Sequence, residues 1–206
     1  MNHLAMFAIT AAALTFIGCD QTNGVGGNGQ PSRERPQPVD ESTASTGTVI
    51  FTGGYETDPR DNGRPVALIA GALGVEDQVF RDAFSNVNPA HNGRPSEAEA
   101  QRNKRVLLDA LGPHGITNER PDEVSDYYRY RQQEDELWPV KPAEAKAIIT
   151  DGKVTSFEIT DAGSGYSSTP TVKVAGHPNI RVEATLEFSN DFSANGRVTK
   201  LEIVSE

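Results

Sequence analysis

The sequence is poor in the residues that stabilise a fold covalently. Cys19 is the only cysteine among 206 residues. Because a disulfide needs two thiols, the chain cannot form an intrachain disulfide, and the packing of apolar side chains must hold the fold together.

A hydrophobic run long enough to span a membrane is also missing. The longest apolar stretch, from Leu4 to Gly18, has 15 residues, and the first 18 residues contain no Asp, Glu, Lys or Arg. A spanning helix needs about 20 apolar residues, whereas the apolar segment of a signal peptide is shorter. We therefore expect residues 1–18 to be a signal peptide that directs export.

Basic residues are neither abundant nor gathered. The chain has 19 Lys and Arg against 29 Asp and Glu, a formal charge of −10. Binding of phosphates requires clustered positive charge, so we expect no nucleic-acid partner and no broad attraction to anionic lipid. Membrane contact should come from an anchor.

Motifs for catalysis and metal binding are lacking as well. The four histidines are far apart in the sequence: His3, His91, His114 and His177. No H-E-x-x-H pattern and no G-x-S-x-G elbow is present, so we expect neither a metal nor another cofactor. Acidic residues form three close groups: Asp58 with Asp61, Asp122 with Glu123, and residues 134–136. Two carboxylates in a cleft could act as an acid–base pair, which keeps a hydrolase as an alternative.

The apolar leader ends in Phe16-Ile17-Gly18-Cys19, which resembles the lipobox of bacterial lipoproteins. The resemblance implies that a diacylglyceryl group is attached to the Cys19 thiol and that a peptidase cuts just before this residue. The mature protein would then begin at an acylated (for example palmitate-bearing) cysteine. The alternatives are a plain secretory signal or a buried apolar helix, with Cys19 incidental.

Residues 20–47 are rich in Gly, Pro, Ser, Thr and Gln and contain no aromatic residue. Such a composition buries too little apolar surface to offset the entropy of ordering. We expect residues 19–47 to be the lipidated cysteine and a disordered linker, with a reach of about 30 Å.

The segment 48–145 is predicted to be a mainly helical domain. After a short apolar stretch at 48–52, helices are expected at 65–73, 75–84, 96–111 and from 121 to about 131. The prediction rests on apolar residues at helical spacing and on capping residues, including Ser96 and Glu99 at the spacing of a capping box.

A short pattern, [DN]-P-x-x-N-G-R-P, occurs at 58–65 and again at 88–95. Turn formers followed by a proline at a helix start explain it through backbone chemistry alone. The alternative makes Arg64 and Arg94 paired anion-binding residues at helix N-termini.

Polar and aromatic residues are densest at 127–131. This cluster supplies candidates for ligand binding because Tyr and Arg are enriched in binding hot spots: Tyr127, Arg129, Tyr130 and Arg131. The alternative has one or two tyrosines in the core and both arginines paired with nearby acids. Trp138 and Tyr166 complete the candidates, as exposed aromatics that could stack on a glycan.

From residue 146 the apolar pattern alternates, and 146–206 is predicted to be a β-rich module. The pattern G-[KR]-V-T-x-Φ-E-I begins at Gly152 and recurs 44 residues later at Gly196, with Thr155, Phe157 and Ile159 expected on one strand face. Residues 163–172 resemble the G-x-G-Y-x-S-x-P-x-V element of exported bacterial β proteins. This resemblance implies a β structure and no activity.

The sequence therefore predicts an α+β protein with a small helical domain and a β-rich repeat module behind a signal and a tether. We expect a non-catalytic envelope lipoprotein, anchored by lipid on the periplasmic face of a membrane or at the cell surface, with a structural or interaction role. Its partners would be the membrane and an envelope protein or glycan. The alternatives are a glycan- or peptidoglycan-binding module and a carboxylate-dependent hydrolase.

Overall fold

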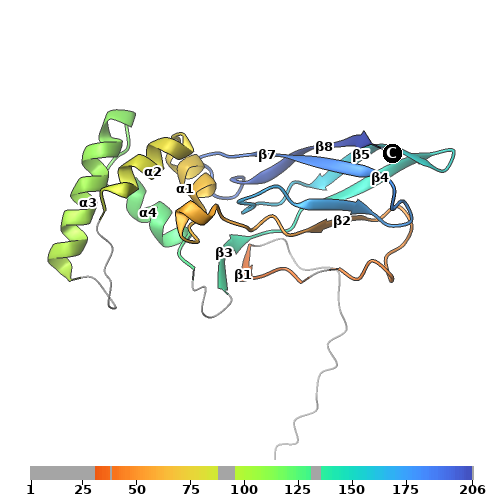
Figure 1. Cartoon of the computed structure of the whole chain (residues 1–206), viewed down its shortest axis with the longest axis horizontal. Helices are drawn as coiled ribbons and strands as arrows, with labels where there is room; N and C mark the ends of the chain where they lie inside the picture. The colour runs from red at the N-terminus through yellow and green to blue at the C-terminus, as the bar shows by residue number, and fades with distance from the viewer. Residues whose placement is uncertain (1–30, 38, 88–95, 131–135, 206) are drawn as a thin grey trace, which may run out of the picture.

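The computed structural model describes residues 31–37, 39–87, 96–130 and 136–205. Helices gather at one end of the molecule and the longer strands run toward the other end (Figure 1). The protein has the α+β fold that the sequence predicts.

In the described residues, four α-helices and two short 3₁₀ turns lie between the strands β2 (Val49–Thr52) and β3 (Glu136–Val140). The α-helices are α1 (Val66–Leu73), α2 (Asp77–Ser85), α3 (Glu97–Leu111) and α4 (Arg120–Tyr127), and the 3₁₀ turns are η1 (Pro59–Asp61) and η2 (Gly112–His114). The α1 helix ends at Gly74 in the left-handed conformation, with φ of 73°. The α3 helix begins with the predicted capping box, in which the Ser96 side chain accepts from the Glu99 amide and the Glu99 carboxylate accepts from the Ser96 amide. The α4 helix is shorter than predicted, because it ends at Tyr127.

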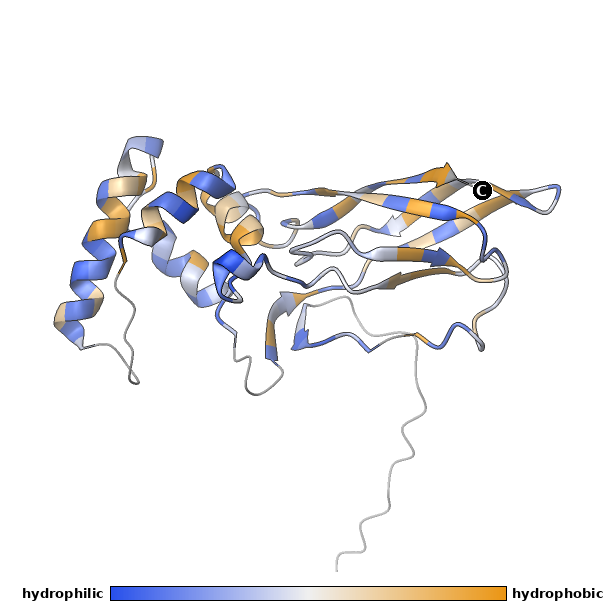
Figure 2. Cartoon of the chain, viewed as in Figure 1, coloured by the Kyte–Doolittle hydropathy of each residue, from blue (hydrophilic) through white to orange (hydrophobic). Residues whose placement is uncertain are grey.

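The strands in the described part of the chain form one four-stranded and two two-stranded antiparallel sheets. They are β1 (Ser32–Glu34), β2 (Val49–Thr52), β3 (Glu136–Val140), β4 (Glu144–Thr150), β5 (Lys153–Asp161), β6 (Thr171–Val174), β7 (Arg181–Glu187) and β8 (Arg197–Ser205). The four-stranded sheet has the order β2-β6-β7-β8, and β1 pairs with β3 and β4 with β5. Apolar and polar residues alternate along the longer strands (Figure 2).

The helices are an insertion in the β structure. The β2 strand precedes them and pairs with β6, which follows them by more than 100 residues. The β4 strand contains residues 145 and 146, so the predicted division between helical domain and β module falls inside a strand. The β4–β5 pair meets both edges of the four-stranded sheet. At the β2 edge, a bridge joins Thr48 to Lys146 of β4, and at the β8 edge, β5 contacts β8.

The internal repeat encodes a shared irregularity. In β5, Thr155 is an extra residue that has no partner on β4, and in β8 the equivalent Thr199 has no partner on β7. Each threonine hydroxyl donates to a carbonyl on the neighbouring strand, Thr155 to Ile148 at 3.2 Å and Thr199 to Thr185 at 3.3 Å. A β-bulge of this kind bends and twists a strand. Both copies therefore bend at the same position.

This bulge corrects the predicted face of the first copy. Thr155 is exposed and Val154 is buried, while Phe157 and Ile159 are partly buried as predicted. A strict alternation from Ile159 would place Thr155 inward, but the extra residue shifts the alternation by one.

The G-S-G-Y segment packs closely against the strand before β4. Gly163 and Gly165 have φ of 63° and 82°, and a Cβ on either would lie 2.5 Å from a backbone oxygen, that of Lys141 or Pro139. Only glycine fits such close contacts without displacing the backbone. Pro170 then leads into β6, as expected from its lack of an amide donor.

A buried amide joins the helices to the strands. Asn195, in the β7–β8 loop, is fully buried and donates to the Leu68 carbonyl of α1 and to the Tyr128 hydroxyl, both at 2.7 Å. Its own side-chain oxygen accepts from the Ser189 amide at 3.0 Å. Because each polar atom of the amide is satisfied, its burial fixes the relative position of the two ends.

Part of the segment predicted to be disordered belongs to the fold. Arg33 donates to the carbonyl of Tyr127 at 3.2 Å, β1 pairs with β3, and the Gly47 amide donates to the Ala175 carbonyl at 2.8 Å. Residues 31–37 and 39–47 gain these hydrogen bonds from distant parts of the chain, which a composition-based prediction of disorder leaves out. The predicted linker is therefore shorter at its C-terminal end.

Candidate functional site

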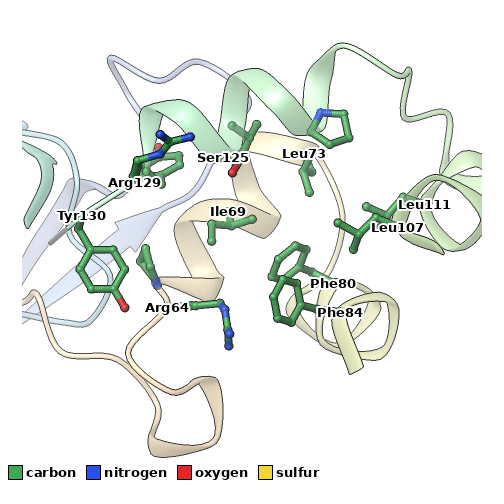
Figure 3. Close-up of a pocket in the computed structure, with 14 residues that line it drawn as sticks. Arg64, Ile69, Leu73, Phe80, Phe84, Leu107, Leu111, Ser125, Arg129 and Tyr130 are labelled. Atoms are coloured by element: carbon green, nitrogen blue, oxygen red, sulfur yellow. The ribbon is translucent and has the colours of Figure 1, made fainter. Parts of the chain in front are cut away.

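A cavity of about 320 Å³ lies where the four helices converge (Figure 3). This volume is at the lower end of the roughly 300–1,000 Å³ of typical small-molecule sites. The lining is mainly apolar and comes from all four helices and the segments beside them: Arg64, Pro65, Ile69, Leu73, Phe80, Phe84, Leu107, Leu111, Pro121, Val124, Ser125, Tyr128, Arg129 and Tyr130.

Each helix contributes a pair of residues four positions apart, which share a helix face. The pairs are Ile69 with Leu73, Phe80 with Phe84, Leu107 with Leu111, and Val124 with Tyr128, the residue that caps α4. The Phe80 and Phe84 rings are 5.7 Å apart between centroids. The wall of the cavity is therefore encoded by ordinary amphipathic periodicity.

One end of the cavity is polar. The Arg64 guanidinium carbon lies 4.1 Å from the centroid of the Phe84 ring, and its Nη1 donates to the Asp61 carbonyl at 2.9 Å. Figure 3 shows the Tyr130 ring on the same side of the cavity as Arg64, with its hydroxyl directed toward it. Burial raises the pKa of the Tyr130 hydroxyl, and the positive charge of Arg64 opposes that rise.

The carboxylate closest in sequence to Arg64 is already paired. Both side-chain oxygens of Asp61 accept from Arg81 at 2.9 Å, in a bidentate ion pair in which Asp61 is 5% exposed. Within the described ranges, Arg64 forms no ion pair. Its cation is thus held at the cavity by a ring and a carbonyl.

Two of the sequence-predicted site residues are buried in the core, so the expectation that they lie exposed is wrong. Trp138 and Tyr166 are each 1% exposed. Trp138 Nε1 donates to the Gly165 carbonyl at 2.8 Å, and the Tyr166 hydroxyl accepts from the Ala143 amide at 2.9 Å. Tyr166 also stacks on Tyr55, with ring centroids 5.2 Å apart. Buried rings with satisfied polar atoms stabilise the core and cannot stack on a glycan.

The remaining candidates at 127–131 separate. Tyr127 stacks on Phe192 with centroids 4.3 Å apart, and Arg129 forms an exposed ion pair with Asp126 at 2.6 Å. Tyr130 lines the cavity and meets Trp138 edge to face at 5.7 Å. Arg131 lies outside the described residues. Tyr127 of this cluster thus packs on the β7–β8 loop, whereas Tyr130 lines the cavity.

The acidic groups singled out in the sequence pair with basic side chains. Asp58 pairs with Arg60 at 2.7 Å, Asp122 with Lys104 at 2.5 Å, and Glu123 with Arg120 at 3.1 Å. Residues 134 and 135 lie outside the described residues. In the part of the chain that the structure describes, no group of three or more His, Cys, Asp or Glu side chains could hold a metal ion.

The predicted signal peptide, Cys19 and Arg94 also lie outside the described residues. Among the described helices, none combines the length and the apolar character needed to cross a membrane. Comparisons with protein-family models, with curated proteins and with solved structures find no match for this chain.

The cavity was not predicted, although the apolar pairs that line it can be recognised in the sequence. Apolar residues at helical spacing predict the faces on which helices pack, and they do not show whether that packing is complete. Leu107 and Leu111 repeat the same spacing on α3, where Leu111 is the only fully buried residue. The structure shows that α3 buries little of its length, so its apolar pair is incompletely packed and leaves a cavity.

Proposed function

We propose that this chain is a membrane-tethered envelope lipoprotein with a non-catalytic role, and that its helical end binds a small apolar ligand. The observation that carries the binding role is the cavity of about 320 Å³ between α1, α2, α3 and α4. An apolar cavity lined from several separate elements is the usual form of a small-molecule site.

The lining supports binding rather than hydrolysis. Among the described residues, the cavity wall includes no carboxylate and no histidine. A carboxylate-dependent hydrolase needs two carboxyl groups that face its substrate. The ionisable side chains that do line the cavity are two arginines and two tyrosines, which suit recognition.

The tethered location rests on the leader. An apolar run of 15 residues without charge ends directly before Cys19, the only thiol of the chain. A lipid on this residue would place the cavity near the membrane, where small apolar compounds concentrate. Mass spectrometry of the mature N-terminus tests the anchor: we expect a diacylated Cys19, and a free thiol or an intact Met1 would contradict it.

Titration calorimetry with a neutral apolar compound, decanol, tests the binding role. We expect saturable binding to the full-length protein and its loss in Leu107→Trp, because the larger side chain occupies the space beside Leu111. Ile149→Trp is the matched control, since Ile149 is an exposed apolar residue on β4, away from the helices. Equal binding of decanol by both variants would refute the cavity as the site.

A further inference from the structure

The cavity has different chemistry at its two ends. Leu107 and Leu111 of α3 lie at one side, and Arg64 and Tyr130 lie at the other (Figure 3). A ligand that fills the whole space must therefore be apolar along most of its length and polar at one end.

Arg64 sets the sign of the charge at the polar end. Its guanidinium is fixed over Phe84 at 4.1 Å and uses one nitrogen on the Asp61 carbonyl. A guanidinium has five N–H donors in a planar fork, which matches the two oxygens of a carboxylate or phosphate. With the Asp61 carboxylate engaged by Arg81, an anion on a ligand would meet donors that no described carboxylate occupies.

Tyr130 adds a neutral donor beside this cation. Its partly buried hydroxyl has a raised pKa, so it stays protonated at neutral pH and can donate to an anion. Arg129 differs from Arg64, because it is 70% exposed at the rim and its charge is paired with Asp126 at 2.6 Å. Of the two arginines in the cavity wall, Arg64 is the one without an ion pair among the described residues.

We propose that the cavity binds a single-chain anionic amphiphile, with its acidic head group on Arg64 and Tyr130 and its chain among Ile69, Phe84 and Leu107. This inference rests on the proposed binding role and names its ligand class. A free fatty acid and the phosphate of a single-chain lipid share this chemistry.

Titration calorimetry with four compounds of equal chain length separates charge from hydrophobicity. Decanoate and decyl phosphate are anionic, decanol is neutral, and decyltrimethylammonium is cationic. The three ionic compounds are used below their critical micelle concentrations and decanol below its solubility limit. We expect at least one anion to bind about tenfold or more tightly than decanol, because a hydrogen bond to a charged group contributes about that difference in affinity. The cation should bind most weakly. The tighter of the two anions identifies the head group.

Arg64→Gln tests the residue. We expect the affinity for the tighter of the two anions to fall about tenfold, because the charged hydrogen bond to its head group is lost. The affinity for decanol should stay unchanged, which would show that the cavity is intact. Arg60→Gln is the matched control: Arg60 lies in η1 close by, pairs with Asp58 and does not line the cavity, so this variant should retain the preference for anions.

Three outcomes overturn the inference in distinguishable ways. If decanol and both anions bind the unmodified protein equally, the cavity is an apolar site and the charge of Arg64 has no part in binding. If none of the four compounds binds, the proposed binding role fails together with the inference. A preference for anions that survives in Arg64→Gln would assign the head group to other residues.

Discussion

The two ends of the molecule bury apolar side chains in different ways. At the β end, inward residues of β5, β7 and β8 follow a ladder of backbone hydrogen bonds that is bent at equivalent bulges. At the helical end, four pairs of apolar residues converge from separate helices and leave a cavity between them. A ladder fixes the spacing of neighbouring strands, whereas helices that meet only through side chains can stop short of complete packing.

The sharpest test of this difference is one substitution at two positions of α1. Leu68 is 0% exposed and packs toward the β7–β8 loop, where a Cβ on Gly196 would lie 2.6 Å from it, while Leu73 lines the cavity. We expect Leu68→Ala to lower the free energy of unfolding by about 4–5 kcal/mol and Leu73→Ala by about 2–3 kcal/mol, since Leu73 has fewer packed neighbours to lose. Urea unfolding measures both, and equal losses would show that the two ends are packed alike.

Loss of the Asn195 hydrogen bonds, which join the helical end to the β end, should have the next largest effect on stability. In Asn195→Leu, the Leu68 carbonyl and the Tyr128 hydroxyl lose their donor in a buried place. We expect a loss of about 1–3 kcal/mol in the free energy of unfolding. Hydrogen exchange should show faster opening of α1 and α4 than of β7 and β8, and uniform acceleration across the molecule would argue against a joint.

The two bulges should respond equally to the same change. Thr155→Val and Thr199→Val each remove one hydroxyl hydrogen bond across the strand pair, and we expect each to cost about 0.5–1.5 kcal/mol in urea unfolding. Thr171→Val, on an exposed position of β6, is the control and should change stability little. Clearly unequal effects of the first two would show that the repeat is not equivalent in energy.

The ion pair between Lys141 and Asp161 should make the smallest contribution to stability, and this contribution should depend on pH. The hydrogen-bonded Lys141 side chain holds the pKa of the Asp161 carboxyl below its ordinary value of 3.8. Because the pKa of Asp161 is lower in the folded state than in the unfolded state, the ion pair contributes its full stability at a pH above the unfolded-state pKa. This contribution is lost as the pH falls through the folded-state pKa. Asp161→Asn should therefore lower stability by at most about 1 kcal/mol at pH 7. The difference from the unmodified protein should vanish in acid, and a difference that grows there would reverse the assignment.

The sequence alone determined much of the local structure. The capping box at Ser96, the left-handed end of α1 at Gly74 and the strand starting after Pro170 each follow from the chemistry of a few adjacent residues. Such signals are local, so no distant part of the chain is needed to interpret them. The repeat likewise predicted two equivalent strands, β5 and β8.

Only the tertiary structure decided where the aromatic residues lie. Trp138 and Tyr166 are candidates for exposed recognition from sequence, yet both are buried, because Gly165 and Ala143 offer backbone partners from elsewhere in the fold. Tyr130, in the same class of candidate, does line a cavity. Residue type indicates what a side chain can contact, and burial by distant segments determines what it does contact.

The cavity itself is the clearest case of this division. The sequence determined which helical faces are apolar through the four-residue spacing of pairs such as Phe80 with Phe84 and Leu107 with Leu111. Whether those faces close on one another or leave space depends on helix positions set by Asn195 and by the pairing of β2 with β6, contacts that join residues more than 100 positions apart. Periodicity is a property of one segment, whereas the space between segments is a property of the whole fold.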